Sequence, residues 1–278
     1  MRGALRTSSA MSIPNGFLPR LLAGASLPPR GLAYLAARPA LWPLAAVPAV
    51  LTLLGIVAVL FLGGPFAGWL LGLLWTRPEA WLWLALWRVA QAAIWLVLLV
   101  LGAFGLPTAL SAPALDVLST RVERLELGEV EGQGGLGRAV AETVRGVANS
   151  LVRLLWFALG HALLLLVLLV PVVNVAYPVL AFLWTARWTA VEYLDLPMAR
   201  HLHRLGDVHA ALRSIRPLGL GLGGVLALAL VVPFANLLVV PAGSVAGTLL
   251  YCALVRARLA PAAVPPTPPP PLPAPSSR

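Results

Sequence analysis

The chain has 278 residues, of which 60% are hydrophobic and 11% are charged. Soluble domains carry about 25% charged residues, so this composition excludes a soluble protein and indicates an integral membrane protein. The formal net charge is +10, and in so apolar a chain we attribute it to arginines that face anionic lipid on the cytoplasmic side, not to nucleic acid. Cys252 is the only cysteine, which excludes an intrachain disulfide and a cysteine metal cluster.

The two ends of the chain differ in composition from the middle. Residues 1–15 are expected to be disordered, and the N-terminal region lacks the compact apolar core and cleavage site of a signal peptide. Either Met1 or Met11 is compatible with the start of the protein. Residues 259–278 are rich in proline and are expected to form a disordered tail. This leaves a single membrane domain over 16–258.

Two long transmembrane helices are predicted in the first half. No charged residue lies between Arg38 and Arg77, so the first helix is placed at about 41–75. The second is placed at about 79–127, with Arg88 as the only charge in its apolar part and leucines and valines at helical spacing beyond it. Tryptophans crowd around the turn between the two helices, as an aromatic belt at a membrane interface does.

The second half is predicted to hold an amphipathic helix and two apolar hairpins. The amphipathic helix, at about 137–153, is expected to lie near the lipid headgroups. It leads into a run without Asp, Glu, Lys or Arg at 154–186, and a second such run lies at 217–255. A spanning helix needs about 20 apolar residues. The first run, of 33 residues, is too long for one span and too short for two, and the second, of 39, is borderline.

Both runs contain the same interruption, a proline followed three residues later by asparagine. Pro171 and Asn174 form the first break, and Pro233 and Asn236 form the second. We expect each helix to enter the membrane, break, and return to the side from which it came. The hairpins are placed at about 154–194 and 217–256. The predicted fold is therefore an all-α integral membrane protein with two long transmembrane helices and two re-entrant hairpins. Broken backbone at membrane depth needs shelter by protein or a water-filled cavity, so the breaks are candidate functional sites.

The distribution of arginine predicts the orientation. The turn between the long helices carries Arg77 alone, whereas the segments 1–40, 121–153 and 187–216 are rich in arginine. Arginine in short loops is concentrated on the cytoplasmic side of membranes. Both chain ends are therefore expected in the cytoplasm, and both hairpins are expected to enter from that face.

Several motifs, taken in order, are similar to those of one known family. They are Gly31-Leu32-Ala33-Tyr34-Leu35, Arg38-Pro39-Ala40-Leu41-Trp42, Pro113-Ala114-Leu115-Asp116-Val117-Leu118-Ser119, Val122-Glu123, Glu192-Tyr193-Leu194-Asp195-Leu196-Pro197-Met198 with His201, and the two Pro-x-x-Asn breaks. Together they resemble the CysZ-type sulfate permease and etoposide-induced membrane protein family over about residues 16–258. The motif residues to which we assign structural roles are Pro113, Asp116, Glu123, Pro171, Pro178, Glu192, Tyr193, Asp195, Pro197, His201, Pro233 and Pro241.

The resemblance implies a fold and a function. The fold has two long transmembrane helices and two hemi-penetrating hairpins, assembled as a dimer or a higher oligomer. The function is sulfate uptake for cysteine synthesis across the bacterial inner membrane. One departure concerns a Gly-Leu-Arg element that CysZ-type permeases carry near the start of the first long helix and that is associated with sulfate binding. Here the matching stretch reads Ala40-Leu41-Trp42, so its arginine is absent, and Arg38 is close but shifted.

The asparagines at the two breaks are the first candidate pathway residues. An amide side chain can satisfy backbone groups that a proline leaves open, so Asn174 and Asn236 can act as turn caps. The returning half-helix would also point its positive N-terminal end into the membrane, as broken helices do in transporters that hold anions. The two roles are compatible.

Four basic or titratable side chains are further candidates for the anion pathway. Arg88 either snorkels to the aromatic belt or lines a pore. His161 is either a buried polar group facing other helices or a proton relay. Arg38 and Arg187 are candidates for an anion access point, although most charges around Arg187 are expected to be solvated or paired at the headgroup level.

Motifs of enzymes and metal sites are absent from the sequence. His201, His203 and His209 lie close together in sequence, but without cysteine or a well-spaced pair of carboxylates they do not predict a metal site. The chain has no His-Glu-x-x-His, no phosphate-binding loop and no evident catalytic triad, so we predict neither enzymatic activity nor a cofactor. The favoured function is a permease or channel for a small inorganic anion, with sulfate implied by the resemblance. The alternative is a non-transporting membrane scaffold or envelope-maintenance protein of the same fold.

Overall fold

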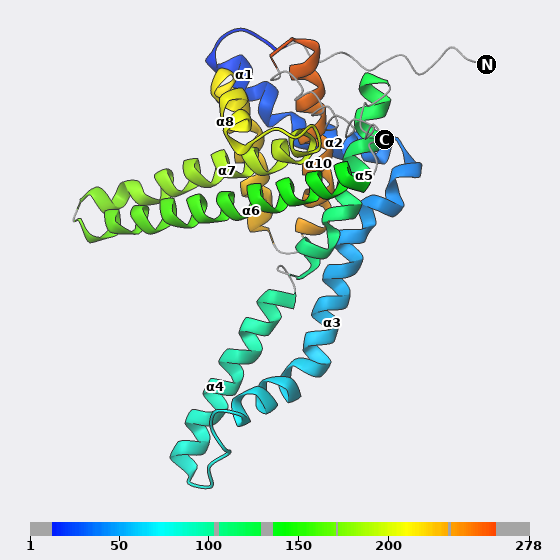
Figure 1. Ribbon diagram of the computed structural model, residues 1–278. Coiled ribbons are helices and arrows are strands. Elements are labelled where there is room, and N and C mark those ends of the chain that lie inside the picture. The colour runs from blue at the N-terminus through cyan, green and yellow to red at the C-terminus, as the bar shows by residue number, and fades with distance from the viewer. Residues whose placement is uncertain (1–12, 103–105, 129–135, 171, 233–234, 260–278) are drawn as a thin grey trace, which may run out of the picture.

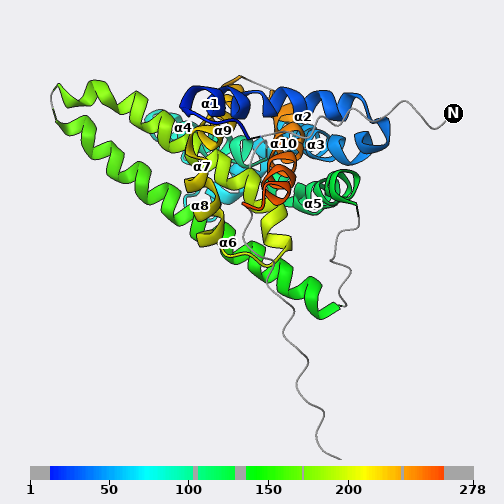
Figure 2. The same cartoon turned by 90° about the horizontal axis from the view of Figure 1, so that it is seen from above.

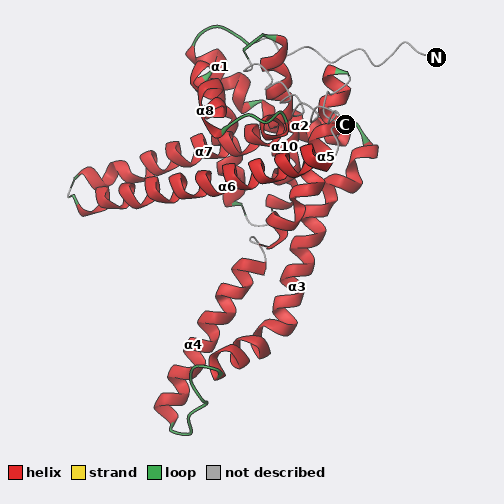
Figure 3. Cartoon of the chain, in the orientation of Figure 1, coloured by secondary structure: helices red, strands yellow, loops and turns green. Residues whose placement is uncertain are grey.

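The computed structural model describes residues 13–102, 106–128, 136–170, 172–232 and 235–259, and these form helices and their connections (Figures 1 and 3). The elements are α1 (Phe17–Ala25), α2 (Leu27–Ala36), η1 (Pro39–Leu41), α3 (Trp42–Gly72), α4 (Trp81–Val100), α5 (Leu106–Leu127), α6 (Leu136–Leu165), η3 (Leu166–Leu169), η4 (Val173–Ala176), α7 (Tyr177–Arg200), α8 (Leu205–Ser214), α9 (Arg216–Val231) and α10 (Asn236–Arg256). No strand occurs in these ranges, which confirms the all-α prediction.

Four helical stretches are long and apolar enough to cross a membrane. They are Pro39–Gly72, Trp81–Leu99, Ala148–Leu169 and Leu237–Arg256. The first three are almost entirely unburied, whereas 72% of the apolar window in the last is buried inside the protein. The exposed apolar surface of the first three suits contact with lipid, and the chain is a multi-pass membrane protein.

Helices α3 and α4 run side by side and form an arm that extends away from the rest of the protein (Figure 1). Side chains of α4 donate hydrogen bonds to backbone carbonyl oxygens of α3. Gln91 Nε2 donates to Gly64 O at 3.1 Å, and Trp95 Nε1 donates to Val59 O at 3.2 Å. These bonds fix α4 against α3 where both helices otherwise present apolar side chains outward.

The second long helix, predicted over 79–127, corresponds to α4 and α5. Helix α4 ends at Val100 and α5 begins at Leu106, and residues 103–105 between them lie outside the described part of the structure. That the two segments form one continuous helix stays a prediction.

Helices α6 and α7 form a second arm that points in a different direction from the first (Figures 1 and 2). The amphipathic segment predicted at 137–153 and the apolar segment that follows are a single helix, α6, whose sequence contains no proline. The chain reverses beyond η3, where Val172 has a φ of 71°, a conformation that β-branched residues rarely adopt. Pro178 then lies in the first turn of α7, a position that suits proline.

Helix α10 is the centre of the protein core at the base of both arms. It packs against α2, α3, α5, α7 and α9. Several of the helix contacts bring backbones together at glycine. A Cβ on Gly223 of α9 would lie 1.8 Å from the carbonyl oxygen of Ala186 in α7, and one on Gly247 of α10 would lie 2.2 Å from that of Tyr193. Glycine at these positions permits the close approach of the helices.

Candidate functional site

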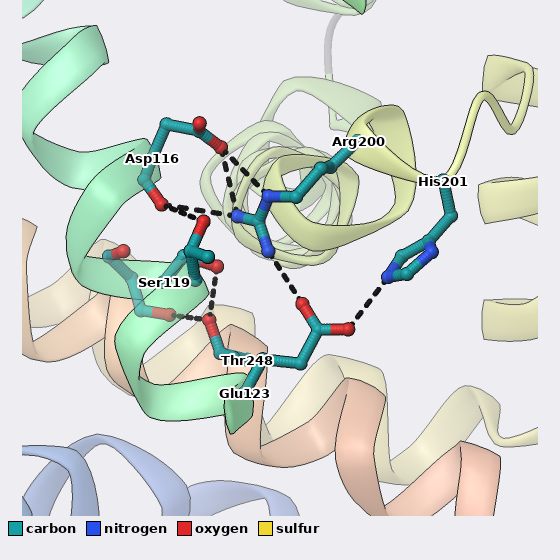
Figure 4. Close-up of polar contacts among 8 residues, drawn as sticks. Asp116, Ser119, Glu123, Arg200, His201 and Thr248 are labelled. Atoms are coloured by element: carbon teal, nitrogen blue, oxygen red, sulfur yellow. Dashed lines mark hydrogen bonds and ion pairs between the residues drawn. The ribbon is translucent and has the colours of Figure 1, made fainter. Parts of the chain in front are cut away.

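A buried cluster of charged side chains joins α5 to the end of α7 (Figure 4). Arg200 bonds to Asp116 Oδ1 through Nη2 at 2.9 Å and to Glu123 Oε2 through Nη1 at 2.5 Å. Its Nε also donates to Asp116 Oδ1 at 3.2 Å, and its Nη2 donates to the carbonyl oxygen of Asp116. Arg200 and Glu123 are buried, and Asp116 is half-buried. The Arg200–Glu123 pair is therefore desolvated, whereas the Asp116 side chain is 49% exposed to solvent.

Helical spacing places the two carboxylates on one face of α5. Asp116 and Glu123 are seven residues apart, close to two helical turns, so both point toward α7. Arg200 is the last residue of α7, and His201 follows it. The Nε2 of His201 lies 2.6 Å from Glu123 Oε1.

Helix α10 borders the same cluster. Tyr251 stacks on the His201 ring, with 5.3 Å between the ring centroids. The hydroxyls of Ser119 in α5 and Thr248 in α10 are 2.8 Å apart and buried. The polar contacts thus join three helices that are distant in sequence.

The contacts of Arg200 determine what this cluster can do. All three nitrogens of its guanidinium already donate to carboxylate or carbonyl oxygens. A solute anion would have to displace carboxylates from Arg200 at a large cost in free energy. We therefore assign the cluster to holding α5, α7 and α10 together.

A second buried polar group joins α6 to α7. Asp195 accepts from Asn149 Nδ2 at 3.0 Å and pairs with Arg153 Nη1 at 3.0 Å. Burial raises the pKa of the Asp195 carboxyl, and Arg153 and Asn149 oppose part of that shift. Asn149 also donates to the carbonyl oxygen of His203 at 3.4 Å, and burial lowers the pKa of His203. This group fixes the base of the α6–α7 arm.

The two predicted break asparagines lie in different parts of the structure. Asn174 is exposed within η4, at the turn of the α6–α7 arm. Asn236 is the first residue of α10, and its side chain lies outside the described part of the structure, as do Pro171 and Pro233. In Figures 1 and 2 the turn of the α6–α7 arm lies far from α10. One chain alone therefore does not bring the two breaks together.

The remaining four candidate residues lie at separate places in the structure, and three of them have simple local contacts. Arg38 lies over the ring of Tyr34, with its Cζ 3.5 Å from the ring centroid. Arg88 is exposed on α4, where its Nη1 donates to Gln91 Oε1 at 3.3 Å. His161 is half-buried, and its Nδ1 lies 3.2 Å from the carbonyl oxygen of Phe157.

Arg187 is exposed on α7 and lines two cavities. One, of about 90 Å³, is shared with Arg216 of α9, and the other, of about 510 Å³, lies between α6, α7 and α8. Arg213 and Arg216 are close enough for their charges to act on Arg187. Its surroundings are therefore strongly basic.

The motif residues to which sequence analysis gave structural roles are mostly at helix contacts. Glu123, Tyr193, Asp195, Pro197 and Pro241 are buried, Asp116 and His201 are half-buried, and Pro113, Pro178 and Glu192 are exposed. Arg200 is the residue that sequence reasoning missed, because it lies among the charges that were expected to be solvated or paired at the headgroup level. The signal that could have identified it is the pair of carboxylates seven residues apart, which share one face of α5 and suit a cation between them.

No group of three or more His, Cys, Asp or Glu side chains that could hold a metal ion occurs among the described residues. Of the three histidines considered for such a site, His201 bonds to Glu123, and His209 Nδ1 lies 3.0 Å from the carbonyl oxygen of Leu205. His203 is buried with its Nε2 unbonded. The three side chains thus have separate environments.

A comparison with family models matches most of the helical core. The model described as Sulfate transporter CysZ/Etoposide-induced protein 2.4 matches residues 27–241. The chain belongs to this family. The resemblance drawn from the sequence motifs is thereby confirmed.

Individual members of the CysZ family are similar over parts of the chain. The sulfate transporter CysZ of Pseudomonas fluorescens Pf-5 is 33% identical over 147 residues, which cover 52% of this chain and 59% of that protein. That of Pseudomonas aeruginosa LESB58 is 36% identical over 144 residues, or 51% of this chain and 58% of that protein. That of Salmonella typhimurium LT2 is 25% identical over 193 residues, which cover 68% of this chain and 76% of that protein. The chain thus spans less than two thirds of the length of the Pseudomonas relatives.

The position of the missing CysZ-type arginine has a different role here. Trp42, which stands where the Gly-Leu-Arg element would place that arginine, is the first residue of α3. Its Nε1 donates to the carbonyl oxygen of Leu35 at 2.9 Å. The side chain therefore links the end of α2 to the start of the long arm.

Proposed function

We propose that this protein is a permease or channel for a small inorganic anion, and that the anion is sulfate. Membership of the CysZ family carries the proposal, and the relatives that match this chain are named sulfate transporters. The arginines of the described surface supply positive potential for attracting an anion toward the membrane. Uptake of this kind would feed sulfur assimilation and cysteine synthesis.

The membrane arrangement that we propose has α3 and the α4–α5 segment as the two long transmembrane elements. The α6–α7 and α9–α10 pairs are then re-entrant hairpins. Helix α9 has 16 residues and is about 24 Å long, shorter than the hydrocarbon core of about 30 Å. The α6–α7 arm diverges from the α3–α4 arm, so both cannot lie along the membrane normal (Figure 1). Both features favour hairpins that turn back within the bilayer.

We further propose that the protein lies in a bacterial inner membrane with both chain ends in the cytoplasm. Arg77 is alone in the turn between α3 and α4, whereas arginines are frequent near α6, α7 and α8. The positive-inside tendency then places the α3–α4 turn outside and the bases of both hairpins inside.

The proposed anion pathway includes Asn174 and Asn236, with Arg38 and Arg187 at its cytoplasmic access and Arg88 and His161 as further contributors. Helices α7 and α10 begin just after or at the two asparagines, so their positive ends lie at the turns. Because one chain holds the two turns apart, a pathway that uses both would be completed by a second copy of the chain. A homo-oligomer is therefore part of the proposal.

Uptake of labelled sulfate by the purified protein in liposomes tests the function. We expect the wild-type protein to admit sulfate, and Asn174→Ala and Asn236→Ala to reduce the rate at equal protein content. Asn15→Ala, an exposed position before α1, is the matched control and should leave the rate unchanged. Unchanged rates in both hairpin variants would remove the turns from the pathway.

The observation at Trp42 favours a second candidate, a membrane scaffold or envelope-maintenance protein of the same fold. In this chain the position of the sulfate-associated arginine is used to join α2 to α3. Such a protein would show no flux of sulfate or of other oxyanions in the same liposomes. That result would reject transport and leave the scaffold function.

A further inference from the structure

Three arginines gather on the surface where α7, α8 and α9 meet. Arg187, Arg213 and Arg216 are all exposed, and the charges of the latter two act on Arg187. None of the three forms an ion pair with a carboxylate of the described chain, in contrast to Arg153, Arg200 and Arg256. A concentration of like charge without a counter-ion is unfavourable unless an anion from outside the chain neutralises it.

An apolar groove begins at one of these arginines, Arg187. The cavity of about 510 Å³ between α6, α7 and α8 is lined by Val152, Trp156, Trp184, Arg187, Trp188, Leu205, Gly206 and His209. Its walls are thus mostly aromatic and aliphatic, with one cation at its edge. Trp184 Nε1 donates to the carbonyl oxygen of Phe157 at 3.3 Å, which fixes one of the indole rings.

Exposed apolar residues of the α6–α7 arm lie close in sequence to Trp156 and Trp184 of the groove. Leu155 and Leu159 on α6 and Leu183 on α7 are all exposed, although they are large hydrophobic residues. Tryptophan is the residue that favours the level of the lipid headgroups, where its ring is apolar and its N–H is polar. The site therefore has a cationic end, an aromatic middle and an apolar extension.

We propose that this groove binds an acidic phospholipid. The phosphate lies against Arg187, Arg213 and Arg216, and one acyl chain lies along Trp156 and Trp184 toward the exposed leucines of the arm. Arginine suits phosphate because its planar group can donate two hydrogen bonds to one phosphate. An acidic lipid matches all three parts of the site.

A free inorganic anion matches only part of the site. Sulfate or phosphate could contact the three arginines but would leave the aromatic groove unfilled. The surface also lies beside helices that face lipid, where phospholipid is present at high local concentration. For these reasons we assign the aromatic groove, with Arg213 and Arg216 beside it, to a lipid, while Arg187 at its edge also belongs to the proposed anion access.

Native mass spectrometry of the full chain, purified in detergent and supplied with lipids of identical acyl chains, tests this proposal. We expect phosphatidylglycerol to be retained in preference to phosphatidylcholine. Arg213→Gln combined with Arg216→Gln should weaken that retention on the order of tenfold or more, given the contribution of each basic residue near an anionic lipid. Arg187 is left in place because it is also a candidate for anion access.

A matched pair of substitutions separates a specific site from a general effect of charge. Arg30→Gln combined with Arg77→Gln removes the same charge from exposed positions on α2 and beyond α3, which do not line the groove. We expect retention of phosphatidylglycerol to be unchanged in this pair. Equal retention of the two lipids by the wild-type protein, or an equal loss in both pairs, would overturn the proposal.

Small anions provide the remaining comparison. Inorganic phosphate and glycerol 3-phosphate carry the charge of the lipid without its acyl chains, and neither should displace phosphatidylglycerol at millimolar concentration. Displacement by either would show a site for small anions and reject the lipid assignment. Because sulfate flux is not measured, this result stands apart from the proposed transport function.

Discussion

Arg200 illustrates how one side chain can hold helices together without any contact to a solute. Its guanidinium lies between Asp116 and Glu123, and its donors are used within the protein. Removing it would leave the buried carboxylate of Glu123, and the half-exposed one of Asp116, without their cation. Breaking a buried ion pair in this way costs more than the intact pair contributes.

We predict that Arg200→Gln lowers the free energy of unfolding by about 3–5 kcal/mol, because Glu123 remains buried without a full positive charge beside it. Thermal unfolding in detergent measures the effect. Arg121→Gln, an exposed position on α5 between the two carboxylates, is the control and should change stability by less than about 0.5 kcal/mol. Equal stability of the two variants would contradict the assignment of Arg200.

His203 gives the stability a predictable dependence on pH. Burial lowers its pKa in the folded protein below the usual value of 6.5, with Asp207 opposing the shift. The unfolded chain therefore binds the proton more readily, and the stability contributed by neutral His203 is lost as the pH falls below 6.5. We predict that His203→Gln, which cannot be protonated, loses less stability than the wild type between pH 7 and pH 5. Melting temperatures over this range, in one detergent, provide the measurement, and parallel curves for the two proteins would refute the prediction.

At the scale of elements, glycine contacts determine how closely helices approach. We predict that Gly223→Ala destabilises the protein by about 2 kcal/mol or more, because its methyl group would overlap the carbonyl oxygen of Ala186 in α7. Gly64→Ala in α3 is the control, since a Cβ there meets nothing within 4 Å. Thermal unfolding of the two variants tests the prediction. A similar loss in both would contradict a specific role for the contact between α7 and α9, because alanine is itself the better helix former.

The elements also show what sequence patterns can and cannot predict. Apolar length predicted the α3–α4 pair, and Pro178 marked the place where α7 begins. Periodicity could not show that α6 is continuous, since a change from amphipathic to apolar sequence does not end a helix.

Contacts between distant residues were the part least open to prediction. The partners of Arg200 lie 77 and 84 residues away in the chain, so local charge patterns placed it in a solvated loop. The cluster of Arg187, Arg213 and Arg216 likewise requires α7, α8 and α9 to meet. Sequence indicated which residues were charged, but only packing determined which of them had partners.

The whole molecule allows a direct test of topology, because Cys252 is buried and should not react with a membrane-impermeant maleimide. We predict that Glu79→Cys is labelled from outside the cell and Ala257→Cys only from the cytoplasmic side; both positions are exposed. Asn174→Cys should resist labelling from outside. Ready labelling of Asn174→Cys from outside would replace the re-entrant α6–α7 hairpin by ordinary through-going helices.

The divergence of the two arms has a consequence for the bilayer itself. The α3–α4 arm is narrow, whereas the helical base and the α6–α7 arm together are broad (Figure 1). With the α3–α4 arm along the normal, the protein would occupy more area in one leaflet than in the other. A flat membrane can accommodate such a wedge only if the lipids of its two monolayers pack unequally. We therefore expect the protein to be enriched in curved regions of the membrane. That preference follows from shape, and it would persist in a variant that conducts no ions.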